Sequence, residues 1–354
     1  MLAMLNSPSW LKPEIIPGLP FRWYGLMYVV AFLITWVLFR YESKREKKPW
    51  TEETAANFFL WSIIGILIGG RLGGTLIYEP TNYYWTHPWM ILWPFDESGA
   101  FVGYQGMSFH GGLVGLIAAT LIWCKVKRES WLEWADLIAV AAPLGYTFGR
   151  LGNFINGELW GKVTTAPWGM VFPGAPAFSA DQPWVRDIAA KVGIPITSAT
   201  QMVNLPRHPS QLYEALFEGL VLWLFLWFVL RKRKTFPGCN LSAYIIGYGF
   251  VRFFIEYFRE PDASLGYIIK WGDPNAPTYL FTTPLNFSMG QILCFLMIVA
   301  GSILMYVFYR RSKTHPAQVA SARGEARVNT GAANAAATRK VQSSMARKRR
   351  KQIK

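Results

Sequence analysis

The stretch DLIAVAAPLGYTFGRLGNFINGELWG, residues 136–161, ends an apolar run of helix length with Arg150 and several polar side chains. A run of this kind is typical of a helix that crosses a bilayer, which needs about 20 mainly apolar residues. An ionisable side chain at the centre of such a helix costs about 2.5–3.5 kcal/mol or more, so it usually faces a partner or a cavity. Arg150 therefore indicates a polar feature inside a membrane protein.

The composition of the chain supports a lipid environment. Of 354 residues, 52% are hydrophobic and only 16% are charged, whereas soluble proteins have about 25% charged residues. The net charge of +15 is unevenly placed, because residues 310–354 hold 13 of the 36 Lys/Arg and only one acid. This tail carries +12 and residues 1–309 carry +3, so the basic character belongs to an appendage and we expect no nucleic-acid partner.

Seven apolar segments have about the length of a membrane span. They are residues 23–39, 56–78, 107–124, 137–155, 211–230, 241–258 and 289–309. We therefore predict an all-α polytopic membrane protein with seven transmembrane helices. The first span should stay in the mature protein, because four prolines in residues 1–22 leave no uninterrupted apolar core for a signal peptide.

The distribution of Lys and Arg between the loops predicts the orientation. Residues 40–50, 125–135 and 231–240 hold 12 Lys/Arg in 32 residues, whereas the alternate loops 79–109, 157–209 and 259–288 hold six in 114. Because cytoplasmic loops are rich in Lys and Arg, the N-terminus is predicted outside and the C-terminus in the cytoplasm. The 53-residue loop 157–209 is long enough to form a small periplasmic subdomain.

The chain accordingly divides into a transmembrane domain, residues 1–310, which includes the loop 157–209, and a basic cytoplasmic tail, residues 311–354. The low complexity of the tail predicts disorder, and its charge predicts attraction to anionic headgroups. Cys124, Cys239 and Cys294 show no paired or metal-ligand spacing, so we interpret them as packing residues and expect no metal or cofactor. The glycine clusters GGRLGG and HGGLVG are typical of closely packed helices.

Polar residues within the predicted spans all fall toward the outer leaflet. At 1.5 Å per residue the set comprises Tyr24, Arg71, His110, Arg150, Gln211, Glu214, Glu218, Arg252, Glu256 and Gln291. A single member is equally compatible with a structural role, such as snorkelling of Arg150 or a simple Arg252–Glu256 pair. The bias shared by the whole set favours a polar cavity that opens to the outer leaflet.

The residue types suggest what such a cavity would bind. Arg71, Arg150 and Arg252 outnumber the acids if Glu256 is already paired, and guanidinium forks suit phosphate oxygens. We therefore predict an anionic phospholipid headgroup as ligand. His110 at a helix N-terminus would be held neutral by the positive dipole end and could accept a proton, although an ordinary hydrogen-bonding role fits as well. Glu158 could orient Arg150 or bind substrate.

These motifs resemble those of the bacterial prolipoprotein diacylglyceryl transferases. GRLGNFINGELWG, residues 149–161, is similar position by position to the signature of that family. The blocks FRWYGLMY, GGRLGG, GMSFHGGLVG, RHPSQLYEA and YGFVRFFIEYFREPD resemble its other blocks in the same order. The resemblance covers about residues 15–310 and excludes the tail.

The resemblance implies transfer of the sn-1,2-diacylglyceryl group from phosphatidylglycerol to the thiol of the lipobox cysteine of a preprolipoprotein. A thioether forms and glycerol phosphate leaves, in the first step of lipoprotein maturation. The implied partners are phosphatidylglycerol, preprolipoprotein lipobox peptides and the membrane. The implied location is the bacterial inner (cytoplasmic) membrane, as a multi-pass protein with its active site toward the outer leaflet.

The resemblance also implies roles for individual residues. Arg150, Arg252 and His110 match catalytic positions, and the proton acceptor for the thiol is His110 or a nearby acid such as Glu256. Together with the polar arrangement described above, it leads us to expect a substrate-binding set made of Tyr24, Arg71, Asn153, Asn156, Glu158, Gly161, Tyr248 and Glu256.

Two other function classes could use a membrane cavity. A lipid transporter or scramblase would need a polar path through the cytoplasmic half, but inner segments such as VLWLFLWFVL, residues 221–230, are apolar. An intramembrane protease would need a Gly-x-Ser-Gly element or a pair of membrane aspartates, and neither is recognisable in the sequence. An enzyme that works at one leaflet is therefore favoured.

Overall fold

The computed structural model describes residues 5–6, 12–16, 22–79, 81, 83–93, 95, 99, 106–262, 265–273 and 275–314. The predicted tail lies outside the described residues from residue 315 onward. The chain forms two compact units. The first consists of residues 1–41 and 135–314, and the second contains residues 42–134.

Helices cover all seven predicted apolar segments, with boundaries shifted by a few residues. The helical segments are α1 (Trp23–Arg45), α2 (Glu52–Gly73) with the π-helical turn η1 (Gly74–Tyr78), α4 (Phe109–Lys127), α5 (Trp131–Ile155), the run 210–233, α9 (Cys239–Ile255) and α10 (Met289–Thr314). The run 210–233 alternates between helix types: α7 (Ser210–Tyr213), η3 (Glu214–Val221), α8 (Leu222–Phe225), η4 (Leu226–Leu230) and η5 (Arg231–Arg233).

Among the described residues, five helical segments are long and apolar enough to cross a membrane. They are Trp23–Arg45, Glu52–Ile77, Phe109–Lys127, Ser210–Arg233 and Met289–Thr314. Helix α5 is not among them, and it contains Pro143 and polar residues at both ends. Helix α9 has only 17 residues. The fold is therefore that of a helical, polytopic membrane protein.

In the second unit, α2 packs closely against α4 through glycine. A Cβ atom added to Gly69 would lie 2.7 Å from the Cα atom of Gly115 and closer still to the carbonyl oxygen of Gly111. Small residues let two helix backbones approach in this way, which confirms the interpretation of the glycine clusters. Helix α4 begins after Ser108, whose Oγ accepts a hydrogen bond from the Gly111 amide at 3.1 Å. This unit also contains the short helices α3 (Tyr83–Thr86) and η2 (Pro88–Ile91).

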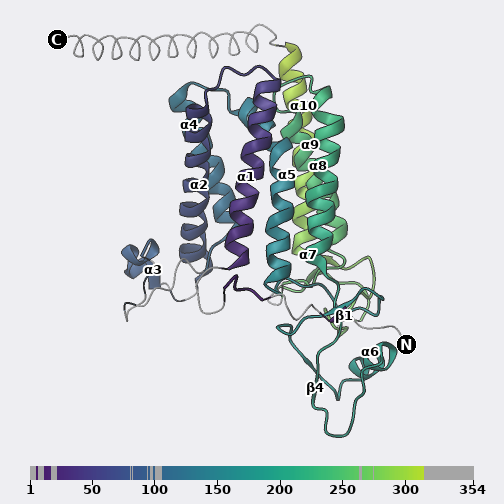
Figure 1. Cartoon of the computed structure of the whole chain (residues 1–354). Coiled ribbons are helices and arrows are strands. Elements are labelled where there is room, and N and C mark those ends of the chain that lie inside the picture. The colour runs from purple at the N-terminus through teal and green to yellow at the C-terminus, as the bar shows by residue number, and fades with distance from the viewer. Residues whose placement is uncertain are drawn as a thin grey trace, which may run out of the picture. The chain divides into compact units, whose positions relative to one another are not determined.

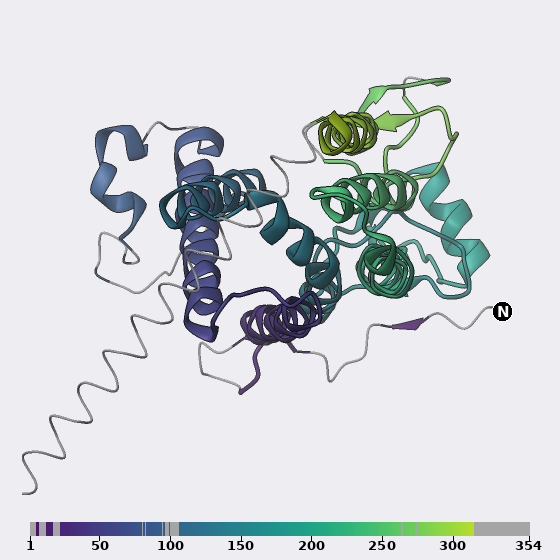
Figure 2. The same ribbon diagram turned by 90° about the horizontal axis from the view of Figure 1, so that it is seen from above.

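In the first unit, α5, α8, α9 and α10 run side by side (Figures 1 and 2). Close approaches again use glycine: a Cβ on Gly219 would lie 3.0 Å from the Cα of Thr147 on α5, and one on Gly249 would lie 3.0 Å from the Cys294 carbonyl oxygen on α10. The last turns of α5 and α9 and the first turns of α7 and α10 lie at one end of these helices (Figure 1). Polar residues at those four helix ends are thereby brought together.

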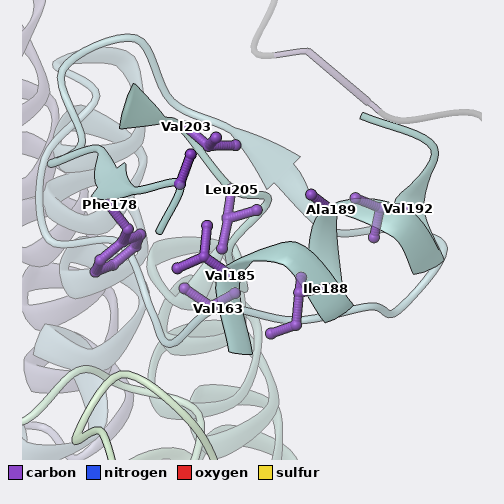
Figure 3. Packing of buried hydrophobic residues seen from close by; sticks show 9 residues of the cluster. Val163, Phe178, Val185, Ile188, Ala189, Val192, Val203 and Leu205 are labelled. Atoms are coloured by element: carbon purple, nitrogen blue, oxygen red, sulfur yellow. The ribbon is translucent and has the colours of Figure 1, made fainter. Parts of the chain in front are cut away.

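The loop 157–209 folds around its own hydrophobic core at this end of the first unit. Helix α6 (Pro183–Val192) packs on an antiparallel pair, β3 (Phe178–Ser179) and β4 (Met202–Val203). Figure 3 shows the core they form: Val163, Phe178, Val185, Ile188, Ala189, Val192, Val203 and Leu205. Two further pairs are β1 (Leu5–Asn6) with β2 (Met170–Val171), which is parallel, and β5 (Tyr267–Ile269) with β6 (Phe287–Ser288), which is antiparallel.

The α2–α4 packing gives a test of the fold. Gly69→Ala should lower the thermal unfolding midpoint of the purified protein, because the new methyl group meets backbone atoms that cannot yield without moving a helix. Overpacking of this kind costs about 1–3 kcal/mol. Gly25→Ala on α1 is the control, since a Cβ there has no neighbour within 4 Å. Equal midpoints for the two variants would contradict the close approach.

Candidate active site

Polar residues of three helical segments meet in a cluster of three arginines and three glutamates. Its members are Arg150 on α5, Glu214 and Glu218 on η3, Arg252 on α9, and Glu256 and Arg259 just after α9. The Glu214 carboxylate lies at the centre. It contacts Nε of Arg150 at 2.9 Å, Nη1 of Arg252 at 3.0 Å and Nη1 of Arg259 at 3.0 Å. The six formal charges add to zero.

The local fold of η3 presents both of its glutamates to the neighbouring helices. Glu214 and Glu218 are four residues apart and both are 0% exposed. A buried carboxylate costs several kcal/mol unless it is paired and hydrogen-bonded. The arginines on α5 and α9 therefore fix how these three segments pack.

Arg252 is engaged at both ends of its guanidinium. Nη1 lies 3.2 Å from Oε1 of Glu218, in addition to its contact with Glu214, and Nη2 lies 3.1 Å from Oε2 of Glu256. The Arg252–Glu256 pair that their spacing suggested is thus present, but as part of a larger cluster. Ser288 donates from Oγ to Oε1 of Glu256 at 3.1 Å, which ties the start of α10 to the same site.

Arg150 is engaged mainly through Nε. This atom donates to the hydroxyl of Tyr146 at 2.6 Å and contacts Glu214, and the guanidinium lies 4.8 Å over the Tyr146 ring. Nη1 makes only a long contact, 3.4 Å, with Oδ1 of Asn153, and within the described part of the chain Nη2 has no hydrogen-bond partner. The Arg150 side chain is 18% exposed. Its Nη edge is therefore the part of the cluster that can bind an added anion.

The rest of the signature forms a polar turn beside Arg150. Asn153 donates from Nδ2 to Oε1 of Glu158 at 2.9 Å, and Asn156 donates to the same oxygen at 3.3 Å. Glu158 therefore orients the two asparagines rather than pairing directly with Arg150. Gln211 donates from Nε2 to the backbone carbonyl of Glu158, which links this turn to α7.

The end of the signature is joined to the end of α9 by backbone contacts. The Gly161 amide donates to the His208 carbonyl at 2.8 Å, and Gly161 bridges to Arg259. A Cβ on Gly161 would lie 2.9 Å from the Cβ of His208 and closer to the Phe258 carbonyl oxygen. Only glycine fits this position without moving the backbone, which gives Gly161 a structural reason for its place in the motif.

Lys162, which the sequence analysis did not single out, is buried next to this junction. It is 1% exposed, donates from Nζ to the Tyr257 carbonyl at 2.9 Å and lies 5.1 Å over the Tyr267 ring. Burial lowers the pKa of Lys162 to about 8, partly offset by the negative charge of Glu256. Burial likewise lowers the pKa of His208 to about 4, with a contribution from the charge of Lys162.

Two further predicted residues of the first unit lie beside the signature turn or beside the cluster. Tyr24 on α1 shares a hydrogen bond with Tyr28, 2.9 Å between the hydroxyl oxygens, and a Cβ on Gly152 of the signature would lie 3.2 Å from its ring. The Tyr248 ring on α9 lies 5.9 Å from that of Tyr146 in an edge-to-face arrangement. Both aromatic rings therefore pack beside residues that contact Arg150 or follow it in the chain.

Arg71 and His110 belong to the second unit. Arg71 is buried and donates from Nε to the Ile91 carbonyl at 2.6 Å and from Nη2 to the Tyr84 hydroxyl at 3.3 Å. These contacts hold η2 and α3 against α2. His110 lies in the first turn of α4, as predicted, and is exposed with its ring edge-to-face to Phe109. Their roles toward the arginine cluster are predictions.

The structure also changes the predicted charge of the site. The sequence suggested an excess of arginine over acid, whereas Glu214, Glu218 and Glu256 balance Arg150, Arg252 and Arg259. The sequence placed the two glutamates of η3 toward the outer leaflet but indicated no role for them. It did not point to Arg259 or Tyr146. Two spacings in the sequence could have indicated these contacts. Two acids lie four residues apart in an apolar span, and Arg259 follows Glu256 by three residues. No group of three or more His, Cys, Asp or Glu suited to a metal ion occurs among the described residues.

Comparison with known proteins places these residues in a family context. A family model described as prolipoprotein diacylglyceryl transferase matches residues 14–307. Relatives named phosphatidylglycerol–prolipoprotein diacylglyceryl transferase include those of Treponema denticola, 50% identical over 88% of this chain and 97% of the relative, and Treponema pallidum, 48% identical over 88% and 98%. That of Chlorobaculum tepidum is 44% identical over 84% of this chain and 89% of the relative.

The buried Lys162 predicts a pH dependence of stability. Between pH of about 8 and about 10.4, the ordinary value, only the unfolded state binds the proton, so the free energy of unfolding rises with pH. Across this window, the free energy of unfolding of the wild type should rise by up to about 3 kcal/mol relative to that of Lys162→Met. Thermal unfolding at several pH values measures this difference. Lys191→Met, an exposed lysine on α6, should show no such trend, and a flat difference for Lys162→Met would refute the buried-lysine account.

Proposed function

The chain belongs to the prolipoprotein diacylglyceryl transferase family, and on this premise we propose that it transfers the sn-1,2-diacylglyceryl group of phosphatidylglycerol to the lipobox cysteine of preprolipoproteins. The thiol becomes a thioether and glycerol phosphate is released. This is the first step of bacterial lipoprotein maturation.

The proposal includes a topology. All seven helical segments cross the inner membrane, with the N-terminus and the subdomain 157–209 on the periplasmic side and the C-terminus in the cytoplasm. The alternation of Lys/Arg-rich and Lys/Arg-poor loops supports this orientation. The polar cluster and the subdomain lie at the same end of the first unit, the end assigned to the outer leaflet (Figure 1). The active site then faces the leaflet to which the secreted acceptor is delivered.

The observation that carries the assignment is the uncommitted Nη edge of Arg150 within an otherwise paired cluster. The phosphodiester of phosphatidylglycerol carries one negative charge, and a guanidinium binds phosphate oxygens with two parallel N–H donors. Arg252 holds Glu214 in place, and Glu214 in turn holds Nε of Arg150. Arg252 therefore acts through Glu214: it fixes the direction in which the Nη atoms of Arg150 point, toward the phosphate.

The chemistry follows from this binding mode. A thiolate attacks the glyceryl carbon that bears the phosphate ester, so that a C–S bond forms while the C–O bond breaks and its electron pair leaves with glycerol phosphate. Arg150 stabilises the growing charge on the phosphate, a contribution of about 2.7–4 kcal/mol by analogy with oxyanion sites. His110 accepts the thiol proton.

The remaining predicted residues bind substrate in this scheme, or position the groups that do. Asn153 and Asn156, held by Glu158, offer polar groups beside the headgroup. Tyr24 and Tyr248 border the same region, Gly161 allows the close backbone approach next to it, and Glu256 positions Arg252. Arg71 is assigned to the same substrate-binding set through the family motif.

Mass spectrometry of a lipobox peptide incubated with the purified protein and phosphatidylglycerol tests the function. We expect diacylglyceryl addition at the cysteine thiol. Arg150→Ala should lower the rate about 100- to 1,000-fold, the usual effect of losing one such donor. The control is Arg186→Ala, an exposed arginine on α6 paired with Asp181, which should keep normal activity. Full activity in Arg150→Ala that inserts normally would exclude the phosphate assignment.

His110 is tested separately. His110→Gln keeps a polar side chain but removes the proton acceptor, so the turnover number should fall about 100-fold or more while the KM for phosphatidylglycerol changes little. Steady-state kinetics at saturating acceptor peptide measure both constants. Normal turnover would remove His110 as the base and leave the phosphate assignment intact.

A further inference from the structure

We infer that the charge-balanced cluster binds its anionic lipid together with one proton, which is taken up by the Glu218 carboxylate. This inference rests on the proposed function, because it concerns the phosphate that Arg150 would bind. It adds a coupling that the proposed reaction does not require: phosphatidylglycerol should bind more tightly as the pH falls.

The cluster is electrically neutral before the lipid binds. Three guanidinium groups face three carboxylates, and the ion pairs among them leave no net charge. A phosphodiester that binds Arg150 adds one negative charge to a site whose carboxylates are buried. Carboxylates near an added negative charge in a low-dielectric site favour the protonated form. Uptake of one proton restores the balance.

The number of arginine contacts selects which carboxylate takes the proton. Glu214 contacts three guanidinium groups, and Glu256 contacts two, at 3.1 and 3.6 Å, and accepts a hydrogen bond from Ser288. Glu218 has one ion pair, with Arg252 at 3.2 Å, and its second oxygen accepts a hydrogen bond from Tyr146. Glu218 therefore loses the least electrostatic stabilisation when it becomes neutral.

Tyr146 links the two events. Its hydroxyl donates to Glu218 and accepts from Nε of Arg150 at 2.6 Å. Once Glu218 is protonated, the Glu218 O–H can donate to the Tyr146 oxygen, and the Tyr146 O–H is released to donate to a phosphate oxygen at Arg150. Tyr146, which is half-buried, thereby exchanges its hydrogen bond to the Glu218 carboxylate for one to the phosphate. The O–H bond of Glu218 is the only covalent bond that forms.

Other groups that face Glu218 do not offer a better site for the proton. Arg150 and Tyr146 lie on α5, Arg252, Tyr244 and Tyr248 on α9, Glu214 on η3 and Cys294 on α10. Arginine is already protonated, and tyrosine and cysteine are neutral near pH 7. Glu214 is the remaining acid on this side, and it is held by three arginines.

Calorimetric titration of the purified full chain with short-chain phosphatidylglycerol, without acceptor peptide, measures the coupling. Titrations in two buffers of different ionisation enthalpy count the protons exchanged. We expect uptake of about one proton for each lipid bound. The Kd for phosphatidylglycerol should therefore rise by up to about tenfold for each unit by which the pH is raised. The lipid phosphodiester itself does not titrate near pH 7, so the pH dependence of the Kd reports protonation of the protein.

Two variants that each neutralise one carboxylate identify the residue. Glu218→Gln imitates the protonated state, so it should bind phosphatidylglycerol without proton uptake and with a Kd that is nearly independent of pH. Asp181→Asn is the control: it neutralises an exposed carboxylate outside the cluster, paired with Arg186, and should keep the proton uptake. The same uptake in Glu218→Gln as in the wild type, or its loss in Asp181→Asn as well, would overturn the assignment to Glu218.

The outcomes separate this inference from the proposed function. Phosphatidylglycerol binding and peptide modification without proton uptake would overturn the coupling and leave the enzymatic function intact. Absence of both phosphatidylglycerol binding and peptide modification in the wild type would overturn the function on which the inference rests, and the inference with it.

Discussion

Pairing of buried charge is the constraint on which the candidate site depends. Glu214 is fully buried, and its carboxylate is stabilised only if guanidinium groups from α5 and from the α9 region reach it together. That requirement fixes the packing of η3 between those segments. Gly219 against Thr147 allows the necessary approach. The contacts that hold these helices together therefore also fix the direction of the Arg150 side chain.

The subdomain and the helices form one support for this cluster. The end of the signature, at Gly161 and Lys162, bonds to the carbonyls of His208, Phe258 and Tyr257, so the turn that carries Asn153 and Glu158 is tied to the segment that carries Glu256 and Arg259. Because every arginine in the cluster has a carboxylate partner, the proposed binding of an anionic headgroup requires correctly directed N–H groups rather than an excess of positive charge. In this proposal, specificity for a phosphate at one place rests on that geometry.

Local patterns predicted the helices well, because apolar length and loop charge act within single segments. They also predicted that Arg150, Arg252 and Glu256 would lie at one end of the helices. The roles of Glu214, Glu218, Tyr146 and Lys162 could not be read in this way, because each depends on a contact between segments far apart in the chain. The predicted arginine excess was wrong for the same reason. Residue counts along one helix do not reveal which acids a neighbouring helix supplies.

An experimental structure with bound phosphatidylglycerol tests the central claim most directly. We expect phosphate oxygens at charge-assisted hydrogen-bond distance, about 2.7–2.9 Å, from the Nη atoms of Arg150, with Glu214 still bridging Arg150 and Arg252. A phosphate bound away from Arg150, with the Arg150 side chain directed at acyl chains or at protein carbonyls, would contradict it.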